Sequence, residues 1–375
     1  MKCTLNLRKK IRKIMKKKIK LFDPIIDKSE EKSIIKVLRS KHWASGSGIG
    51  NVEKFENQFN NYIGSKDSVA VNSGTSALNL ALSLMDIKNK EVIVPSLTFV
   101  STVHAIKLNG GKPIFVDVDK KNLCIDTDEI IKNITPKTKV ILPVHFGGMP
   151  CNLNKIKKIC KEYDLIQVED AAHASGSTYQ NQKIGTHGTA VCFSFHPVKN
   201  LAMPTGGLIS LNTKSSKKFK KILESKRWCG ISDRHDSFYD VKEMGWNYYM
   251  NEFSATIGIS QLKKLDKLNN TRKKIAKIYE KELDVLEKIP FSTNCSYHLY
   301  WILTKKRKSF MKNLNDVGIE TGIHYRPIHK MSYYKSKIKL PITEKAGSEI
   351  VTIPIHPNLT ENNIEKIIKY VNRFS

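Results

Sequence analysis

The sequence contains no long apolar run. No stretch approaches the ~18 apolar residues that a membrane-spanning helix needs, which excludes an integral membrane protein. The first residues also lack the apolar segment of a secretory signal, which argues against export by that route. Hydrophobic residues nevertheless make up 40% of the chain and aromatic residues 8%, enough for a core, so an intrinsically disordered chain is excluded as well.

Acidic residues and arginine are both scarce. The chain has 35 Asp and Glu against 64 Lys and Arg, a formal net charge of +29, which is typical of proteins that bind nucleic acid or anionic surfaces. Only nine of the basic residues are arginine, the residue that best makes bidentate contacts to phosphates and bases. Because the lysines are spread over the whole chain, we attribute the charge to a composition bias, with a functional anion-attracting surface as the alternative.

One dense basic run covers residues 8–20 (RKKIRKIMKKKIK). Its isoleucines and Met15 recur near helical spacing, which predicts a basic amphipathic arm. Alternatively, translation begins at Met15 and the preceding residues are an annotation artefact. We therefore treat residues 1–20 as an N-terminal extension.

The seven cysteines form no CxxC pair and no Cys/His cluster at zinc spacing, so no metal site is expected. An odd number of cysteines in a chain without a signal peptide indicates reduced thiols in a cytoplasmic protein. Most of these cysteines are expected to act as small buried hydrophobic residues.

Between residues 68 and 211, short apolar runs alternate with helical stretches. Continuous apolar runs of this kind predict strands of a mostly parallel sheet with helices on both faces, an α/β fold of the doubly wound kind. The expected strands are Glu91–Val94, Pro113–Val118, Lys139–Val144, Leu165–Val168, Ala190–Phe195 and Gly207–Leu211, and the expected helices include Ser76–Met85 and Leu153–Tyr163.

A long helical stretch over residues 252–288 is expected to lead from this large domain to a smaller C-terminal α+β domain. We expect the cofactor-binding domain to cover residues 21–265 and the small domain residues 266–375. Within the small domain, the pattern predicts a strand at Tyr297–Thr304 and helices at Lys308–Val317 and Glu361–Arg373.

Ligands of such sheets bind beyond the carboxyl ends of the strands. Two segments there carry polar groups: a Ser-Gly-Thr turn opens a helix within residues 71–80, and residues 168–174 (VEDAAHA) lead from a strand into two acids and a histidine. The turn is a candidate phosphate site or an ordinary helix cap. Asp170 is a candidate partner for a ring nitrogen, or part of a structural cap or ion pair.

Two further segments end in the same crevice. Residues 193–200 (FSFHPVKN) deliver Lys199 after a buried strand, although most lysines of such a chain are surface charges. Residues 95–102 (PSLTFVST) place Phe99 on a loop, where it could pack in the core or stack on a planar ligand. A phosphate cradle, a ring-nitrogen acid, an aromatic face and a lysine are together the parts that pyridoxal 5′-phosphate needs.

The chain resembles the DegT/DnrJ/EryC1/StrS family of sugar aminotransferases, fold-type I enzymes that use pyridoxal phosphate. The resemblance runs from about Phe22 to Val371 and rests on ten ordered segments: FDPII (22–26), WASGSG (43–48), VNSGTSAL (71–78), PSLTFVSTVHAI (95–106), PIFVDVD (113–119), VHFGGMPCNL (144–153), VEDAAHASGS (168–177), FSFHPVKN (193–200), GWNYYMNEFSATIGISQL (245–262) and HYRPIH (324–329).

The resemblance implies a role for each matched position. Lys199 would bind the cofactor covalently and move the proton between cofactor and substrate carbons. A lysine amine suits this task because its surroundings can lower its pKa. Asp170 would pair with the pyridine nitrogen. The remaining cofactor contacts would come from His173 near the ring hydroxyl, Phe99 stacked on the ring, and the phosphate-binding residues Gly74, Thr75, Ser194 and, from the partner subunit of a homodimer, Asn247.

The reaction that the resemblance implies has two halves. Glutamate would first donate its amino group to the cofactor, which would then aminate a keto group of a nucleotide-linked keto-deoxy sugar, a 4-keto-6-deoxy sugar being the first candidate, for cell-surface polysaccharide or glycan synthesis. A basic surface would suit a pyrophosphate-bearing substrate. The candidate substrate contacts, which could equally have packing or surface roles, are Arg227, His324, Tyr325, Arg326 and His329.

Two positions depart from the family pattern. Thr205 replaces the acid of a turn that follows the lysine, and Tyr249 stands where many members have arginine. Both departures bear on the identity of the substrate. Three alternatives remain: a related sugar 3-dehydratase, against which Lys199 argues because that branch has histidine there; a cofactor-binding paralogue without turnover; and a nucleic-acid-binding protein, for which no motif is found.

Overall fold

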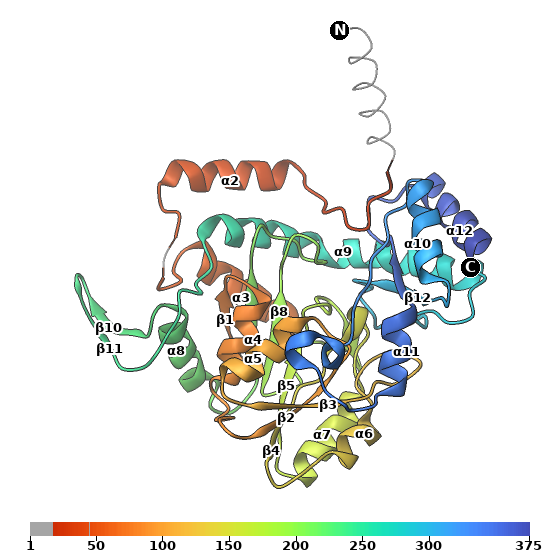
Figure 1. Cartoon of the computed structure of the whole chain (residues 1–375). Helices are drawn as coiled ribbons and strands as arrows, with labels where there is room; N and C mark the ends of the chain where they lie inside the picture. The colour runs from red at the N-terminus through yellow and green to blue at the C-terminus, as the bar shows by residue number, and fades with distance from the viewer. Residues whose placement is uncertain (1–17, 45) are drawn as a thin grey trace, which may run out of the picture.

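The computed structural model describes residues 18–44 and 46–375 (Figure 1). The predicted amphipathic arm and the alternative start at Met15 lie outside the described residues. The end of the N-terminal extension is described, and there Ile19 is buried and forms a parallel bridge with Ile319 of the C-terminal region. The extension therefore joins the fold before residue 21.

A mixed sheet of seven strands forms the centre of the molecule, in the order β1-β9-β8-β5-β4-β2-β3. Five neighbouring strands run parallel, β9 is antiparallel to both of its neighbours, and β1 thus shares the direction of the other five. The strands are β1 (Asp67–Val71), β2 (Glu91–Pro95), β3 (Lys112–Val116), β4 (Thr138–Ile141), β5 (Ile166–Asp170), β8 (Ala190–Ser194) and β9 (Gly207–Leu211).

The predicted α/β fold is confirmed, and each strand expected between residues 91 and 211 is found with its ends shifted by at most a few residues. The sequence pattern missed β1, whose short run Asp67–Val71 precedes the Ser-Gly-Thr turn. Strands β2 and β8 are buried throughout, as expected for strands covered by helices on both faces.

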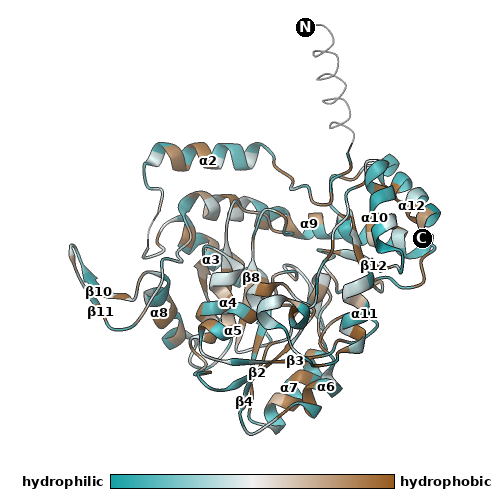
Figure 2. Ribbon diagram, viewed as in Figure 1, coloured by the Kyte–Doolittle hydropathy of each residue, from teal (hydrophilic) through white to brown (hydrophobic). Residues whose placement is uncertain are grey.

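Helices cover both faces of the sheet (Figure 1). Amphipathic helices such as α2 and α7 show alternating hydrophilic and hydrophobic turns in Figure 2. The helices up to residue 227 are α2 (Lys28–Ser40), α3 (Asn51–Ile63), α4 (Gly74–Leu82), α5 (Val100–Leu108), α6 (Thr127–Lys132), α7 (Leu153–Glu162) and α8 (Ser216–Arg227).

Two clusters of buried apolar side chains hold these layers together. The smaller cluster contains residues of α4, α5 and α8, with Leu80, Ile106 and Leu223 among its members. The larger one contains residues of α3, α7 and the long helix α9 (Glu252–Glu282), and it continues into the C-terminal region. Because alternate strand residues such as Val191 and Cys192 belong to different clusters, the two cores lie on opposite faces of the sheet.

Helix α9 connects the sheet layers to the C-terminal region, as the sequence predicted. It packs against α2 and α3, and farther along it meets α12. The C-terminal elements are β12 (Tyr300–Leu303), α10 (Arg307–Asp316), α11 (Pro341–Glu349), β13 (Ile350–Ile353) and α12 (Glu361–Phe374). The predicted division at residue 265 falls inside α9, and the domain boundary stays a prediction.

Short elements complete the described chain. The hairpin β10 (Ile231–His235) and β11 (Phe238–Val241) projects from the body near α8 (Figure 1). The other short elements are the hairpin β6 (Thr178–Tyr179) and β7 (Gln182–Lys183) and the 3₁₀ turns η1 (Phe146–Gly148), η2 (Ile328–Lys330) and η3 (Ser332–Tyr334). Across residues 18–44 and 46–375, no helix is long and apolar enough to cross a membrane.

Candidate active site

A cavity of about 320 Å³ opens beyond the carboxyl ends of β5 and the neighbouring strands. This volume is within the range of roughly 300–1,000 Å³ that is typical of small-molecule sites. Its walls come from the turn before α4, the start of α5, the segments that follow β5 and β8, and the C-terminal segment around Tyr325. The predicted crevice at this edge of the sheet is therefore present.

The Ser-Gly-Thr turn forms one end of the cavity. Ser73 caps helix α4, with its hydroxyl 3.1 Å from the backbone nitrogen of Ser76 that donates to it, so the free backbone N–H groups of the first turn point toward the cavity end. A Cβ atom at Gly74 would lie 2.7 Å from the Cβ of Ser194, so only glycine permits this approach. A helix N-terminus flanked by hydroxyl groups is suited to bind a phosphate.

Asp170 lies at the end of β5 and is buried on the cavity wall. The hydroxyl of Thr102 donates to its Oδ2 over 2.7 Å, and the backbone N–H of Ala172 donates to its Oδ1 over 3.0 Å. Burial raises the pKa of Asp170, while these hydrogen bonds and the charge of Lys199 oppose that shift. The carboxyl group is thus held in one orientation and is ready to pair with a cationic ring N–H.

Lys199 lies in the turn that follows β8, and its side chain lines the cavity. Its Nζ is 3.3 Å from Nε2 of His298. Burial lowers the pKa of Lys199 to about 8, although the nearby charge of Asp170 acts in the opposite direction. The unprotonated amine, which a nucleophile requires, is therefore far more abundant than in an ordinary lysine at the same pH.

His173 connects the sheet edge to the C-terminal segment. The backbone N–H of Gly147 donates to its Nδ1 over 3.3 Å, so the hydrogen of the neutral ring is on Nε2, which donates to the Tyr325 hydroxyl over 3.1 Å. Burial holds the pKa of His173 well below its usual range, so the ring is neutral. The Tyr325 ring also lies 5.8 Å from that of Phe99, which is exposed on the cavity wall.

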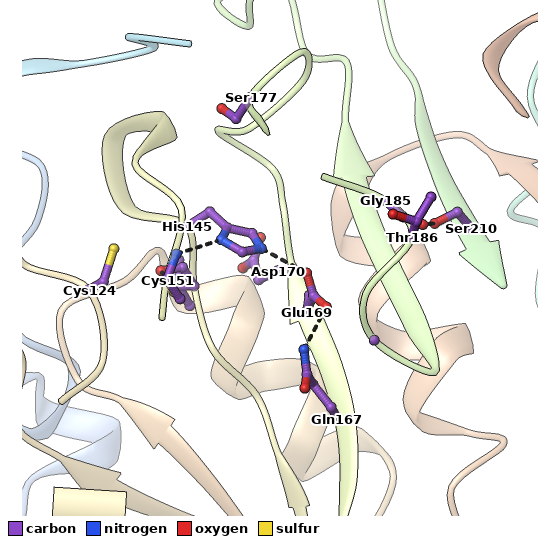
Figure 3. Close-up of polar contacts among 12 residues, drawn as sticks. Cys124, His145, Cys151, Gln167, Glu169, Asp170, Ser177, Gly185, Thr186 and Ser210 are labelled. Carbon is purple, nitrogen blue, oxygen red and sulfur yellow. Dashed lines mark hydrogen bonds and ion pairs between the residues drawn. The ribbon is translucent and has the colours of Figure 1, made fainter. Parts of the chain in front are cut away.

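A buried polar network supports the wall behind Asp170 (Figure 3). The backbone N–H of Cys151 donates to Nδ1 of His145, so the ring hydrogen is on Nε2, which donates to Glu169 over 2.9 Å. Gln167 donates to the other carboxylate oxygen of Glu169 over 2.7 Å. His145 also donates its backbone N–H to the carbonyl of Asp170. This network fixes the loop after β4 against β5.

Most of the predicted site residues meet at the cavity. Those that line it are Gly74, Thr75, Phe99, Asp170, His173, Ser194, Lys199, His324 and Tyr325. Thr205, which departs from the family pattern, also lines the cavity and donates its hydroxyl to the carbonyl of Asn72. Asn247 is exposed and does not line the cavity of its own chain.

Three predicted substrate contacts lie elsewhere, and the structure corrects their positions. Arg227, the last residue of α8, is buried; its guanidinium forms a 2.7 Å ion pair with Glu56 and donates to the carbonyl of Ala70. His329 is buried, with its Nδ1 2.7 Å from the hydroxyl of Ser96 and its Nε2 3.3 Å from the carboxylate of Glu344. Arg326 is exposed and donates to the carbonyl of Lys330. None of the three lines the cavity.

The sequence pattern missed two residues next to the predicted ones. Thr102 donates to Asp170, and the only available signal was its place one turn after Phe99. His298 contacts Lys199 from the segment before β12, 99 positions along the chain, so no local pattern could connect them. The polar residue before an apolar strand in YHLYWILT was the one available hint.

The residues present fit pyridoxal phosphate. The cradle at α4 suits the phosphate, Asp170 the pyridine nitrogen, the Phe99 side chain a ring face and Lys199 the aldehyde carbon. The tight approach of Ser194 to Gly74 leaves no room for a side chain at position 74 of the cradle. This donor set includes both an acid for a ring nitrogen and a nucleophilic amine, which few cofactors require together.

Comparisons with known proteins agree with this fit. Uncharacterized protein MJ1066 of Methanocaldococcus jannaschii is 35% identical over 374 residues, which cover 94% of this chain and 96% of that protein. The structure of PseC from Helicobacter pylori, an aminotransferase involved in the biosynthesis of pseudoaminic acid, matches with a TM-score of 0.90, 27% identity, and coverage of 96% of this chain and 99% of that one.

A proposed sugar aminotransferase from Streptococcus pneumoniae, Spr1654, matches in its PLP form with a TM-score of 0.89, 25% identity, and coverage of 95% of this chain and 98% of that one. Residues 24–372 match the sequence profile of one family along almost the whole chain. With lysine, acid and phosphate cradle at one cavity, the chain belongs to the DegT/DnrJ/EryC1/StrS aminotransferase family, and pyridoxal phosphate is its cofactor.

Proposed function

We propose that the enzyme transfers the amino group of glutamate to a keto group of a nucleotide-linked keto-deoxy sugar, with a 4-keto-6-deoxy sugar as the first candidate. The observation that carries this proposal is the meeting of Lys199, Asp170 and the α4 cradle at one cavity in a chain of this family. The similarity to PseC, which acts in pseudoaminic acid biosynthesis, and to the sugar aminotransferase Spr1654 supports a sugar-derived acceptor. The product would enter cell-surface polysaccharide or glycan synthesis.

The proposed roles of the chain follow from the geometry. When bound, pyridoxal phosphate supplies an electron-withdrawing ring that makes the C–H bond beside the substrate nitrogen acidic. Lys199 attaches the cofactor and afterwards accepts and returns the proton at that carbon, for which its pKa of about 8 is suited. Asp170, oriented by Thr102, holds the ring N–H.

Cofactor and substrate are bound by the other walls of the cavity. Gly74, Thr75 and Ser194 bind the phosphate, while Phe99 covers one ring face and His173 approaches the ring hydroxyl. His324 and Tyr325 are the two predicted substrate contacts that reach the cavity. Burial lowers the pKa of His324 to about 4, so this side chain is a neutral hydrogen-bonding group toward a sugar rather than a cation toward a phosphate.

We further propose that the site is completed in a homodimer, with Asn247 of the partner subunit at the phosphate. The projecting hairpin supports this proposal because it exposes large apolar side chains without a partner in the described chain, with Phe238 83% and Tyr239 58% exposed. We also propose a cytoplasmic location. The described cysteines are free thiols, in agreement with a reducing compartment.

The proposal is tested by incubating the purified enzyme with ¹⁵N-glutamate and a panel of nucleotide-linked keto sugars and searching for labelled amino sugars by mass spectrometry. We expect a labelled product from at least one member of the panel and none with Lys199→Ala. A dehydratase would instead release the nitrogen as ammonia and give an unlabelled deoxy sugar lighter by one oxygen atom. If the cofactor-loaded enzyme labels no sugar, the proposed acceptor class is wrong; if it does not convert glutamate either, the proposed donor is wrong as well.

A further inference from the structure

A second, smaller cavity reaches Lys199 from another side. Its volume is about 10 Å³, which is the space that one water molecule needs. Lys199 and Val198 line both this cavity and the main one. The polar residues that line the smaller cavity beside Lys199 are Asp23, Asn200, Arg272, His298 and His356.

Four residues of this small cavity each have a buried polar atom with no hydrogen-bond partner among the described residues. These atoms are Asn200 Oδ1, Arg272 Nη1, His298 Nδ1 and His356 Nδ1. All four residues are at least nine-tenths buried, with exposed fractions of 4%, 7%, 4% and 6%. A buried polar atom without a partner costs about 1–3 kcal/mol, so four of them around one water-sized space point to a bound ligand there.

The hydrogen bonds around two of these atoms make them acceptors. Nδ2 of Asn200 donates to the side-chain oxygen of Asn269 and to the carbonyl of Ser296, which fixes Oδ1 as the acceptor end of the amide. Nε2 of His356 lies 3.0 Å from the carbonyl oxygen of Lys20, so it carries the ring hydrogen. Nδ1 of the neutral His356 ring is therefore an acceptor.

The other two atoms are donors. Nη1 of Arg272 can only donate, and no carboxylate lies within ion-pair distance of this guanidinium in the part of the chain that the structure describes. Nε2 of His298 accepts a hydrogen bond from the Lys199 ammonium, so the ring hydrogen of the neutral His298 is on Nδ1. Two donors and two acceptors match the hydrogen-bonding capacity of one water molecule, whereas an anion would leave both acceptors unpaired.

We propose that this cavity binds one water molecule and that His298 and this water form a path for protons between Lys199 and the protein surface. The Lys199 ammonium gives a proton to Nε2 of His298, and Nδ1 of His298 gives its proton to the water. The water passes a proton to Nδ1 of His356. His298 is neutral before and after, with its hydrogen moved from one ring nitrogen to the other.

The surface end of this path is Asp23. Its partly exposed carboxylate lines the same cavity, and Lys20 and Asn358 bind it. Burial lowers the pKa of His356, and the charge of Asp23 opposes this shift. The path rests on the proposed function in one respect, namely that Lys199 is the reacting amine. A ligand in the main cavity fills the space on that side of Lys199, so the small cavity offers a second route by which the amine can lose its proton.

The site itself is tested by a crystal structure of the cofactor-loaded enzyme at a resolution that shows waters, with and without a bromide soak. We expect one water bonded to Arg272, Asn200, His298 and His356 in both crystals, and no anomalous bromide signal there. An empty cavity, or bromide in it, overturns the proposal. In Arg272→Met, which removes one donor without contacting Lys199, we expect this water to be lost.

The path is tested by the rate at which the visible absorbance band of the bound cofactor appears after pyridoxal phosphate is added. We expect His298→Gln, which has no second ring nitrogen, to slow this rate by about 10²-fold while the final band is unchanged. Arg272→Met should also slow it, by a smaller factor. His187→Gln, a change at a half-buried histidine outside both cavities, should leave the rate unchanged.

Each result separates the path from the proposed function. Equal rates for the wild type and His298→Gln overturn the path. If His298→Gln does not fold, the rate of Arg272→Met decides, and a wild-type rate in that variant overturns it. A wild type that forms the band but aminates no sugar contradicts the proposed substrate and leaves the rate comparison intact.

Discussion

The sheet edge and two other segments, α8 and residues 297–329, differ in how their predicted site residues are placed. Asp170 ends a strand, Lys199 and Phe99 follow strands, and all three line the main cavity. Of the candidates from elsewhere, His324 and Tyr325 reach the cavity, while Arg227 and His329 are buried away from it.

The difference has a physical cause. Parallel strands end at the same edge of a sheet, so polar residues just after buried strands meet there whatever else the chain does. The positions of residues 297–329 depend on how the C-terminal elements pack on α9 and the sheet. No periodic pattern in the local sequence predicts that packing. Cofactor-binding residues at the sheet edge are thus easier to predict from sequence than substrate-contacting residues in the other segments.

Lys199→Ala tests whether the sheet edge supplies the nucleophile, and it has the largest expected effect. We expect loss of the visible cofactor band and a fall of more than about 10³-fold in glutamate-dependent turnover, because both covalent attachment and proton transfer are removed. Absorbance and single-turnover assays measure the two effects. Lys305→Ala, at an exposed lysine, is the control and should behave as the wild type. A band that persists in Lys199→Ala would place the nucleophile outside the sheet edge.

Arg227→Met tests a residue of the second group. We expect unfolding free energy to fall by about 3–5 kcal/mol, because Glu56 is left as an unpaired buried charge. Urea unfolding measures this change, and Lys312→Met, which breaks an exposed pair with Asp316, should cost no more than about 0.5 kcal/mol. A stable Arg227→Met enzyme with a raised KM for the sugar would show that Arg227 contacts substrate after all.

Much of the fold was predictable because buried parallel strands are continuous apolar runs, as in β2 and β8. The missed strand β1 is short and pairs antiparallel with β9, a contact between positions 67 and 211 that no local pattern encodes. At the site, Asp170 and Lys199 were found from their places after strands. His298 was not, because its contact with Lys199 depends on how the C-terminal elements dock.

The reactivity of the Lys199 amine is expected to depend on pH. Its pKa is lowered from 10.5 to about 8, so the unprotonated amine becomes abundant as the pH rises through 8. In the cofactor-free enzyme, we expect an amine-specific reagent to label Lys199 about 10²-fold faster than Lys305 at pH 8, measured by peptide mass spectrometry. Asp170→Asn removes a charge that favours the ammonium, so the labelling midpoint should move to lower pH. A midpoint for Lys199 near the ordinary lysine value of 10.5 would contradict the buried environment.

The smallest expected effect distinguishes two neighbours in the C-terminal segment. Tyr325→Phe removes the hydroxyl that accepts the hydrogen bond from His173 but retains the ring beside Phe99. A neutral hydrogen bond contributes about 0.5–1.5 kcal/mol, so we expect a few-fold rise in KM with the cofactor band retained. Arg326→Ala, one position along but exposed and outside the cavity, should leave the KM of a single subunit's site unchanged. A larger effect of Arg326→Ala on KM would mean that the substrate extends beyond the cavity, over the C-terminal segment. The exposed Arg326 side chain could contact only a part of the substrate that the cavity does not enclose.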